Sequence, residues 1–417
     1  MAAFQDIFQD VDHTGERDLG VSERTEVIMD KVKLGIIGVG NMGTGHAKNI
    51  MAGKCPEVEL TAVADLDPKR REWAKEHCPE STVIFESGDE LIDSCICDAV
   101  LIAVPHYDHP MLAIRAFGKG QHVMSEKPAG VYTKQVREMN EVAEKSGLVF
   151  GMMFNQRTNA VYRKMHELVQ SGQYGQIKRV NWLITNWYRA QSYYDSGSWR
   201  ATWDGEGGGV LLNQCPHNLD LLQWICGLPV RVQGFAHNGK WHNIEVEDDV
   251  TAYMEFENGA TGVFITSTGD APGTNRFEVD LEKAKIVCEN DTLSVYELEV
   301  NEREHCFTVK NGFKAPEGKY VEVELPEPGY GHVSVLNAFA GKILHGTPLV
   351  AEGVEGIRGL SISNAIHLSA WTGKVVSIPV DEDQFLEELN KKRATSKIKT
   401  GEAVHFDTRG SYEGAKS

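Results

Sequence analysis

The sequence has no apolar run long enough to cross a membrane, and its first 30 residues lack the apolar stretch of a secretory signal. Eight cysteines are scattered over 417 residues, without the paired Cys-x-x-Cys spacing of a zinc site or a disulfide framework. Internal repeats and low-complexity segments are absent as well. These absences predict a cytoplasmic protein with reduced thiols, no membrane contact and no bound metal.

The sequence has fewer basic than acidic residues. The chain has 42 Lys and Arg against 60 Asp and Glu, a formal net charge of −18. Phosphate backbones and anionic membrane surfaces attract positively charged proteins, so we expect no nucleic-acid partner. A length of 417 residues exceeds what one hydrophobic core usually serves, which predicts two domains.

From residue 31 the chain alternates short apolar runs with helical stretches. The apolar runs lie at 32–38, 57–64, 82–85, 98–104, 121–125 and 148–154. This alternation predicts an α/β Rossmann domain over 31–155, a doubly wound parallel sheet that binds its ligand at the carboxyl ends of the strands. Residues 1–30 are acidic and weakly patterned, and we interpret them as an N-terminal arm.

After residue 155 the pattern changes. A helix expected at 158–171 precedes strand-like runs at 176–188, 230–237, 249–256, 260–267, 275–281, 284–288, 293–299 and 319–324. Serial strands without intervening helices predict an α+β domain with a mainly antiparallel sheet over 156–380. Helices at 332–345 and 353–373 close it, and the second can pack back on the first domain. Residues 381–417 form a C-terminal tail, basic at 391–399, that we interpret as a solvated end.

A Gly-x-Gly-x-x-Gly turn follows the first strand and precedes a helix expected at 44–51. Its residues are Gly38, Gly40, Asn41, Met42 and Gly43. Glycines at these spacings allow a tight turn, a close approach by a pyrophosphate and a helix N-terminus that faces the anion. A lone motif of this kind can be a simple turn, but its place between strand and helix predicts a dinucleotide site.

The second strand ends at Asp65. A carboxylate there can accept hydrogen bonds from an adenosine ribose and repel a 2′-phosphate, so we predict NAD rather than NADP as the cofactor. Asp67 is a rival for the ribose. Because Pro68 follows it, Asp67 fits better as the cap of the next helix.

Lys127 follows the fifth strand, between Glu126 and Pro128. At the carboxyl end of a parallel strand it would lie next to a nicotinamide ring, whose positive charge would lower the pKa of the amine. Such an amine can hydrogen-bond a substrate hydroxyl. The alternative is a surface lysine in a turn, but Pro128 can fix the backbone of Lys127, for example through a cis peptide.

The glycine-rich segment 207–209 leads into an apolar helix that we expect to begin near Asn213. Asn213 and His217 would then lie four residues apart on one face and address one substrate hydroxyl. In the alternative, Asn213 is only the N-cap, Pro216 lies in the first turn and His217 is a satisfied core residue.

Together, the glycine turn, Glu126-Lys127-Pro128 and Asn213-x-x-x-His217 resemble the Gfo/Idh/MocA family of sugar and cyclitol dehydrogenases, over about residues 31–380. The resemblance implies an NAD-binding domain and a larger domain whose large, open sheet shapes the substrate site and mediates homo-oligomerisation, as a dimer or tetramer. It implies Lys127 as the active-site lysine and His217 as the usual proton acceptor. Many members carry Asp where this chain has Asn213, and an amide can orient a hydroxyl but cannot relay a proton.

The resemblance also implies that Pro105, His106 and His109 pass beside the nicotinamide, that Glu126 contacts its ribose and that 155–157 enters the second domain, with Arg157 near the substrate. Residues 186–203 are dense in rings and arginines, which suit a sugar's C–H face and its hydroxyls or an appended anion. We interpret them as a lid, with a subunit interface as the alternative. The expected substrate contacts are Trp187, Arg189, Tyr193, Trp199, Arg200 and Tyr330, with Asp248, Asp249 and His332 as weaker candidates.

The resulting hypothesis is an oxidoreductase that transfers a hydride between NAD and a secondary hydroxyl of a sugar, glycoside or cyclitol. Lys127 and His217 would share the acid and base work, and Asn213 would hold the substrate oxygen. Two alternatives stay open. One is an NAD-dependent glycosidase that works by transient oxidation at C3 and elimination, and the other is a regulator that binds the dinucleotide without catalysis.

Overall fold

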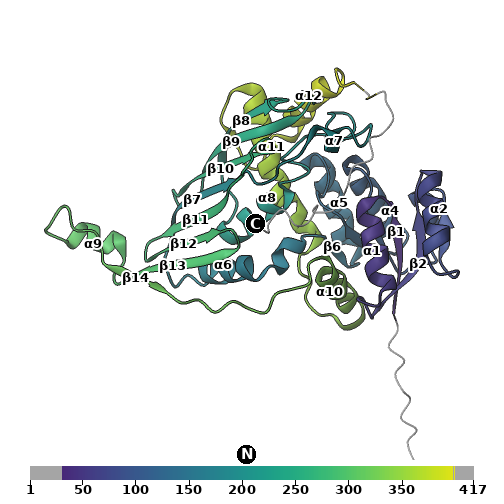
Figure 1. Cartoon of the computed structure of the whole chain (residues 1–417), viewed down its shortest axis with the longest axis horizontal. Helices are drawn as coiled ribbons and strands as arrows, with labels where there is room; N and C mark the ends of the chain where they lie inside the picture. The colour runs from purple at the N-terminus through teal and green to yellow at the C-terminus, as the bar shows by residue number, and fades with distance from the viewer. Residues whose placement is uncertain (1–30, 398, 400–417) are drawn as a thin grey trace, which may run out of the picture. The chain divides into compact units, whose positions relative to one another are not determined.

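Two β-sheets organise the residues described by the computed structural model, 31–397 and 399 (Figure 1). The expected N-terminal arm, residues 1–30, lies outside the described residues, as do residues 398 and 400–417 of the expected tail. Within the described part of the chain, no helix combines the length and the apolar character that a membrane crossing requires.

The first sheet has six strands in the order β3-β2-β1-β4-β5-β6, and every neighbouring pair is parallel. Its strands are β1 (Val32–Ile37), β2 (Val58–Ala64), β3 (Val83–Phe85), β4 (Ala99–Ile102), β5 (His122–Ser125) and β6 (Phe150–Met152). In β1 only Lys33 is exposed, because helices cover both faces of the sheet. The predicted Rossmann sheet is confirmed.

Short helices connect these strands. They are α1 (Asn41–Met51), α2 (Pro68–His77), α3 (Gly88–Ser94), η1 (His106–Asp108), α4 (His109–Gly118) and α5 (Thr133–Ser146). Asp67 caps α2, since its carboxylate accepts a hydrogen bond from the Lys69 N–H at 2.9 Å and Pro68 is the first helical residue. The predicted cap is therefore confirmed.

The second sheet has nine strands in the order β14-β13-β12-β11-β7-β10-β9-β8-β15. They are β7 (Ile177–Ile184), β8 (Arg231–Asn238), β9 (Glu247–Glu255), β10 (Thr261–Ser267), β11 (Asn275–Leu281), β12 (Ala284–Glu289), β13 (Thr292–Leu298), β14 (Gly318–Val321) and β15 (Val376–Ser377). The pair β7–β10 is parallel and the other pairs are antiparallel. The predicted, mainly antiparallel sheet is confirmed.

Helices lie against one face of the nine-stranded sheet (Figure 1). This part of the chain contains η2 (Asn155–Thr158), α6 (Ala160–Gln170), α7 (Gln191–Tyr194), α8 (Pro216–Cys226), α9 (Glu302–Thr308), α10 (His332–His345), η3 (Gly353–Glu355), α11 (Gly356–Thr372) and α12 (Glu382–Arg393). Trp182 of β7 fills the core and stacks on Phe277 at 4.1 Å between ring centroids. Other sheet residues, among them Leu183, Phe235 and Tyr253, remain exposed.

Two late helices return to the six-stranded sheet. Leu336 and Phe339 of α10 share a core with residues of β1, β2 and β4, although the sequence placed this helix within the second domain. Asn364 of α11 accepts a hydrogen bond from the Thr133 N–H at 3.1 Å and donates one to the Val131 carbonyl at 3.0 Å. The chain therefore crosses between the two sheets more than once.

The described part of the tail packs against both domains, since Asp383 and Glu382 of α12 form ion pairs with Lys134 and Arg137 of α5. Phe385 and Leu389 of α12 are buried. Beyond it, the Ser396 hydroxyl donates to the Glu245 carboxylate at 2.6 Å, and the Lys399 ammonium donates to a backbone carbonyl of α7 at 2.8 Å. The interpretation of this segment as a solvated end is wrong for these residues, because the apolar positions of α12 mark a packed face.

Candidate active site

The glycine turn between β1 and α1 leaves no room for side chains at two of its three glycines. Gly38 has a φ of 89°, where L side chains are strained. A Cβ at Gly43 would lie 1.8 Å from the Gly38 carbonyl oxygen. At Gly40, by contrast, a Cβ would meet no protein atom within 4 Å. This open space at the N-terminus of α1 fits a pyrophosphate that approaches the backbone.

The three glycines should therefore respond differently to alanine. Gly40→Ala is expected to leave the free energy of unfolding within about 1 kcal/mol of the parent, yet to weaken NAD binding about tenfold or more, because its methyl group occupies the space for the pyrophosphate. Gly43→Ala should lower stability itself. Urea unfolding and calorimetric NAD titration separate the two effects, and equal NAD affinity for Gly40→Ala and the parent would contradict the proposed site.

Asp65 is fixed beside this turn at the end of β2. Its Oδ2 accepts a hydrogen bond from the Val39 N–H at 2.8 Å, and its Oδ1 accepts one from the Asp67 N–H at 2.8 Å. A carboxylate has about four acceptor sites, so Asp65 can accept further hydrogen bonds from a ribose. The chain places the carboxylate where the NAD prediction needs it.

Glu126 and His46 form a buried pair below the end of β5. His46 Nε2 lies 2.8 Å from Glu126 Oε1, and both side chains are at most 5% exposed. Although burial opposes ionisation, the hydrogen bond and charge of His46 lower the pKa of Glu126 to about 2. The ring of His332, at the start of α10, lies 5.4 Å from the ring of His46. His332, a weaker candidate from the sequence, thus belongs to this cluster.

Lys127 is partly buried next to this pair. Its Nζ donates a hydrogen bond to the Asn213 carbonyl oxygen at 2.9 Å. Burial lowers the pKa of Lys127, while the charges of Glu126 and Glu206 oppose the change. An amine with a lowered pKa exchanges a proton near neutral pH more readily than a free lysine does.

Asn213 lies in a turn before α8, not in the helix. The helix begins at Pro216 with Cys215 at the cap position and no side-chain cap, so both expectations for Asn213, as a helical partner of His217 and as an N-cap, are wrong. Pro216 suits a first helical position, because its missing N–H would have no helical partner there. The Asn213 side chain instead donates to Glu206 and accepts from the Tyr193 hydroxyl at 3.1 Å.

His217 lies in the first turn of α8, within electrostatic range of Lys127. Burial, followed by the charge of Lys127, lowers the pKa of His217 to about 3. Its Nδ1 is buried and has no hydrogen-bond partner among the described residues. His217 is therefore a partly buried, neutral imidazole with an unsatisfied Nδ1, which is not the arrangement of a satisfied core histidine.

The buried state of His217 predicts how stability changes with pH. An unfolded imidazole takes up a proton below about pH 6.5, whereas folded His217 stays neutral down to about 3. The unfolded state then binds more protons in this window, so stability falls with falling pH, by about 2 kcal/mol between about pH 7 and about pH 5. In urea unfolding, His217→Gln should lose correspondingly less stability than the parent. The exposed His237→Gln serves as control, and equal losses for His217→Gln and parent would contradict the prediction.

The segment after β4 is held by two histidines. His109 has its Nδ1 2.8 Å from the Pro128 carbonyl oxygen and its Nε2 2.7 Å from the Val104 carbonyl oxygen, which ties this segment to the one after β5. His106 lies beside the substrate region, with its Nδ1 3.2 Å from the Glu206 carbonyl oxygen. Pro105 precedes η1 at this edge. The three residues thus line the same carboxyl edge as Lys127.

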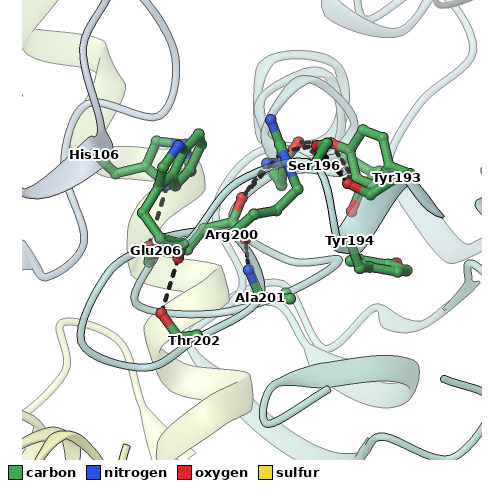
Figure 2. Close-up of polar contacts among 12 residues, drawn as sticks. His106, Tyr193, Tyr194, Ser196, Arg200, Ala201, Thr202 and Glu206 are labelled. Carbon is green, nitrogen blue, oxygen red and sulfur yellow. Dashed lines mark hydrogen bonds and ion pairs between the residues drawn. The ribbon is translucent and has the colours of Figure 1, made fainter. Parts of the chain in front are cut away.

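Glu206 is the site residue that the sequence analysis missed. Its side chain is buried, and burial raises its pKa, with the charge of Arg200 opposing the rise. One carboxylate oxygen accepts from Asn213, and the other accepts from the Ala201 N–H at 2.5 Å (Figure 2). The run Asp-Gly-Glu-Gly at 204–207 has the composition of a surface turn, so only the fold identifies this carboxylate.

The ring-rich residues 187–206, here called the substrate loop, lie beside His106. The ring centroids of Trp199 and His106 are 6.0 Å apart. Arg200 donates to the Tyr193 hydroxyl at 2.8 Å (Figure 2), and Trp187 donates to Asn218 of α8 at 3.1 Å. The loop is therefore packed against His106 of η1 and against α8, the helix that carries His217, and its role as a lid stays a prediction.

Two expected substrate contacts lie elsewhere. Arg157 is 3% exposed and donates to Asp220 at 2.7 and 2.8 Å and to Glu355 at 2.5 Å, so its guanidinium is taken up by internal carboxylates. Tyr330 is 84% exposed. Of the weaker candidates, Asp248 accepts backbone N–H groups of the turn at 240–242. Their positions give no support to substrate contacts by these residues.

A Rossmann sheet with a glycine turn, an acidic residue at the end of its second strand and a partly buried lysine and histidine at its carboxyl edge is typical of an NAD-binding oxidoreductase. Residues 32–154 match the oxidoreductase family model "NAD-binding Rossmann fold", and residues 162–287 match the "GFO/IDH/MocA C-terminal domain". Together these matches cover more than half of the chain. The chain belongs to the Gfo/Idh/MocA family.

The chain shares about a quarter of its residues with several relatives. It is 25% identical over 344 residues to a protein named myo-inositol 2-dehydrogenase from Thermotoga maritima, and the matched region covers 81% of this chain and 96% of the relative. It is 26% identical to 1,5-anhydro-D-fructose reductase from Ensifer adhaerens, over 70% of this chain and 83% of the relative. The WlbA dehydrogenase from Bordetella pertussis, solved with NADH and UDP-GlcNAcA, shares its fold at a TM-score of 0.71 and 24% identity, covering 84% of this chain and all of that one.

Proposed function

We propose that the protein is an NAD-dependent dehydrogenase that acts on a secondary hydroxyl of a sugar, glycoside or cyclitol. The observation that carries the proposal is that Lys127 and His217 lie within electrostatic range of each other at the carboxyl edge of the Rossmann sheet. Both residues are partly buried, and the pKa of each is lowered. The names of the Thermotoga and Ensifer relatives support the substrate class.

When bound, NAD supplies the hydride acceptor in one direction and, reduced, the hydride donor in the other. The chain supplies the proton chemistry. The neutral imidazole of His217 accepts the proton of the substrate hydroxyl, and Lys127 Nζ hydrogen-bonds the same oxygen as its charge changes. The carbonyl of Asn213 holds the lysine in place, while Glu126, ionised against His46, keeps a negative charge beside it.

The glycosidase alternative needs an acid that protonates the leaving group. Glu206 is a buried carboxyl of the substrate loop, and both of its oxygens accept hydrogen bonds from N–H groups. These bonds hold the oxygens against Asn213 and Ala201, so although burial raises the pKa of Glu206, they give a proton-donating role no support. We therefore interpret Glu206 as a residue that positions Asn213 and Arg200.

The test is an assay of the full chain with NAD and a panel of sugars, glycosides and inositols, followed at the NADH absorbance band. We expect NADH formation with at least one member. No turnover across the panel, with NAD bound, would contradict the proposal, and release of an aglycone without net NADH would favour the glycosidase. The exposed apolar residues of the nine-stranded sheet also support a homo-oligomer, which sedimentation analysis can test.

A further inference from the structure

Two arginines of the substrate loop lie against the same ring. The guanidinium carbon of Arg200 is 4.5 Å from the centroid of Tyr193, and that of Arg189 is 5.1 Å from it. Arg200 also contacts Trp199 at 4.6 Å, and Arg189 contacts Trp187 at 5.7 Å. Stacking on aromatic rings orients a guanidinium and leaves its N–H edge for an acceptor.

Acceptors of the protein do not use all of these N–H groups. Arg200 donates to the Tyr193 hydroxyl and lies 3.6 Å from Glu206, but its Nε is buried without a hydrogen-bond partner in the part of the chain that the structure describes (Figure 2). Arg189 donates to the neighbouring Tyr188 carbonyl and forms no ion pair within residues 31–397 and 399. Both arginines are only partly buried, so a ligand that covers them has to supply acceptors for the N–H groups that lose contact with water.

Lys127 adds a third cation to the same region. Its ammonium donates to the Asn213 carbonyl, the Asn213 side chain donates to Glu206, and Glu206 lies 3.6 Å from Arg200. Two carboxylates, Glu126 and Glu206, face the three cations, so the cations outnumber them. The net charge of the chain is −18, so this local surplus of positive charge is opposite in sign to the charge of the protein as a whole. Oxidised nicotinamide, itself a cation, would increase it.

We propose that the substrate carries an oxyanion, a carboxylate or a phosphate attached to the sugar, which Arg189 and Arg200 bind while Lys127 contacts the reacting hydroxyl. The inference rests on the proposed function and narrows its substrate class to acidic sugars. The planar fork of a guanidinium matches the two oxygens of a carboxylate or phosphate, and such charge-assisted hydrogen bonds are about twice as strong as neutral ones. A neutral sugar would leave the positive surplus uncompensated.

The test titrates the NADH-loaded full chain by calorimetry with matched ligands at low ionic strength. D-glucuronate is compared with D-glucose, D-galacturonate with D-galactose, and D-glucose 6-phosphate with D-glucose. We expect an acidic sugar to bind at least about tenfold more tightly than its neutral parent. Preference for the uronates identifies a carboxylate, and preference for the phosphate ester identifies a phosphate. Equal or tighter binding of the neutral parents, or no binding of any acidic sugar at millimolar concentration, overturns the inference.

Variants assign the preference to the two arginines. Arg189→Gln and Arg200→Gln should each reduce the acidic-to-neutral affinity ratio severalfold and leave NADH affinity unchanged. Arg303→Gln is the matched control, because Arg303 also lies over a ring, that of Phe307, but on the distant helix α9 (Figure 1). An undiminished ratio in both loop variants overturns the inference. NADH formation from neutral sugars alone would support the proposed dehydrogenase and contradict the acidic substrate. Selective binding of acidic sugars without any turnover would support the acidic ligand and contradict the dehydrogenase.

Discussion

Lys127→Ala is expected to lower kcat by about 10²- to 10⁴-fold, the usual range for loss of a positioned acid or base. Alanine removes Nζ, the atom of Lys127 that hydrogen-bonds the Asn213 carbonyl, and no other lysine in the described residues bonds this carbonyl. Its loss leaves His217 without the neighbouring amine that hydrogen-bonds the reacting oxygen. The measurement is steady-state NADH formation with the best sugar of the panel.

NAD binding separates this prediction from a role in sensing. The dinucleotide turn and Asp65 lie on other elements than Lys127, so the variant should bind NAD with nearly the affinity of the parent. Lys134→Ala, a change at an exposed lysine paired with Asp383, is the control and should retain full turnover. If Lys127→Ala turned over sugar at the parental rate, the acid-base role of Lys127 would be wrong, and the alternative of a regulator that binds the dinucleotide would gain support.

Asp220→Asn is expected to lower the free energy of unfolding by about 3 kcal/mol or more, because it leaves the Arg157 charge buried with one carboxylate fewer. Asp220 is 1% exposed, and it accepts two hydrogen bonds from the Arg157 fork and a third from the Gln223 side chain at 3.0 Å. The guanidinium also lies 5.5 Å from the Phe154 ring and 5.2 Å from the Trp224 ring. Water therefore cannot replace the lost carboxylate easily. Urea unfolding measures the difference.

A paired apolar replacement tests the cause. Arg157→Met combined with Asp220→Leu removes both charges, and such replacements of buried ion pairs are often neutral. The double variant should thus be more stable than Asp220→Asn alone. Glu255→Gln, which breaks the more exposed pair with Arg231, should have a much smaller effect. If Asp220→Asn unfolded like the parent, the ion pair would not be holding the junction between β6 and α8 together.

Local chemistry explains which parts of the site could be predicted from the sequence. The turn at 38–43 is defined by glycines whose spacing has a direct steric meaning, and the structure bears out the strand before it and the helix after it. Lys127 and Asp65 follow apolar runs, and the carboxyl ends of parallel strands meet at one edge. The two sheets follow from periodicity alone. In each case the information lies within about ten neighbouring residues.

The remaining features depend on contacts between distant residues. Glu206 is a site residue only because the substrate loop folds it against Asn213 and below His106. The sequence does not indicate that Arg157 is paired with a carboxylate, because its partner Asp220 lies 63 residues further along the chain. The predicted start of α8 differs from the observed one by three residues, because the turn at 209–215 is closed by its own backbone hydrogen bonds and by the carboxylate of the distant Glu247, which accepts from the N–H groups of Gly209 and Leu211.

The return of α10 to the six-stranded sheet bears on how the protein can be divided. Leu336 and Phe339 complete the core beside β1, so a fragment ending near residue 155 would expose that surface to solvent. A cofactor domain expressed alone would be prone to aggregate, and a single protease cut near residue 155 would leave both halves associated. The dinucleotide half is thus dependent on a helix encoded almost two hundred residues downstream, and any domain exchange or shortened enzyme has to carry that helix with it.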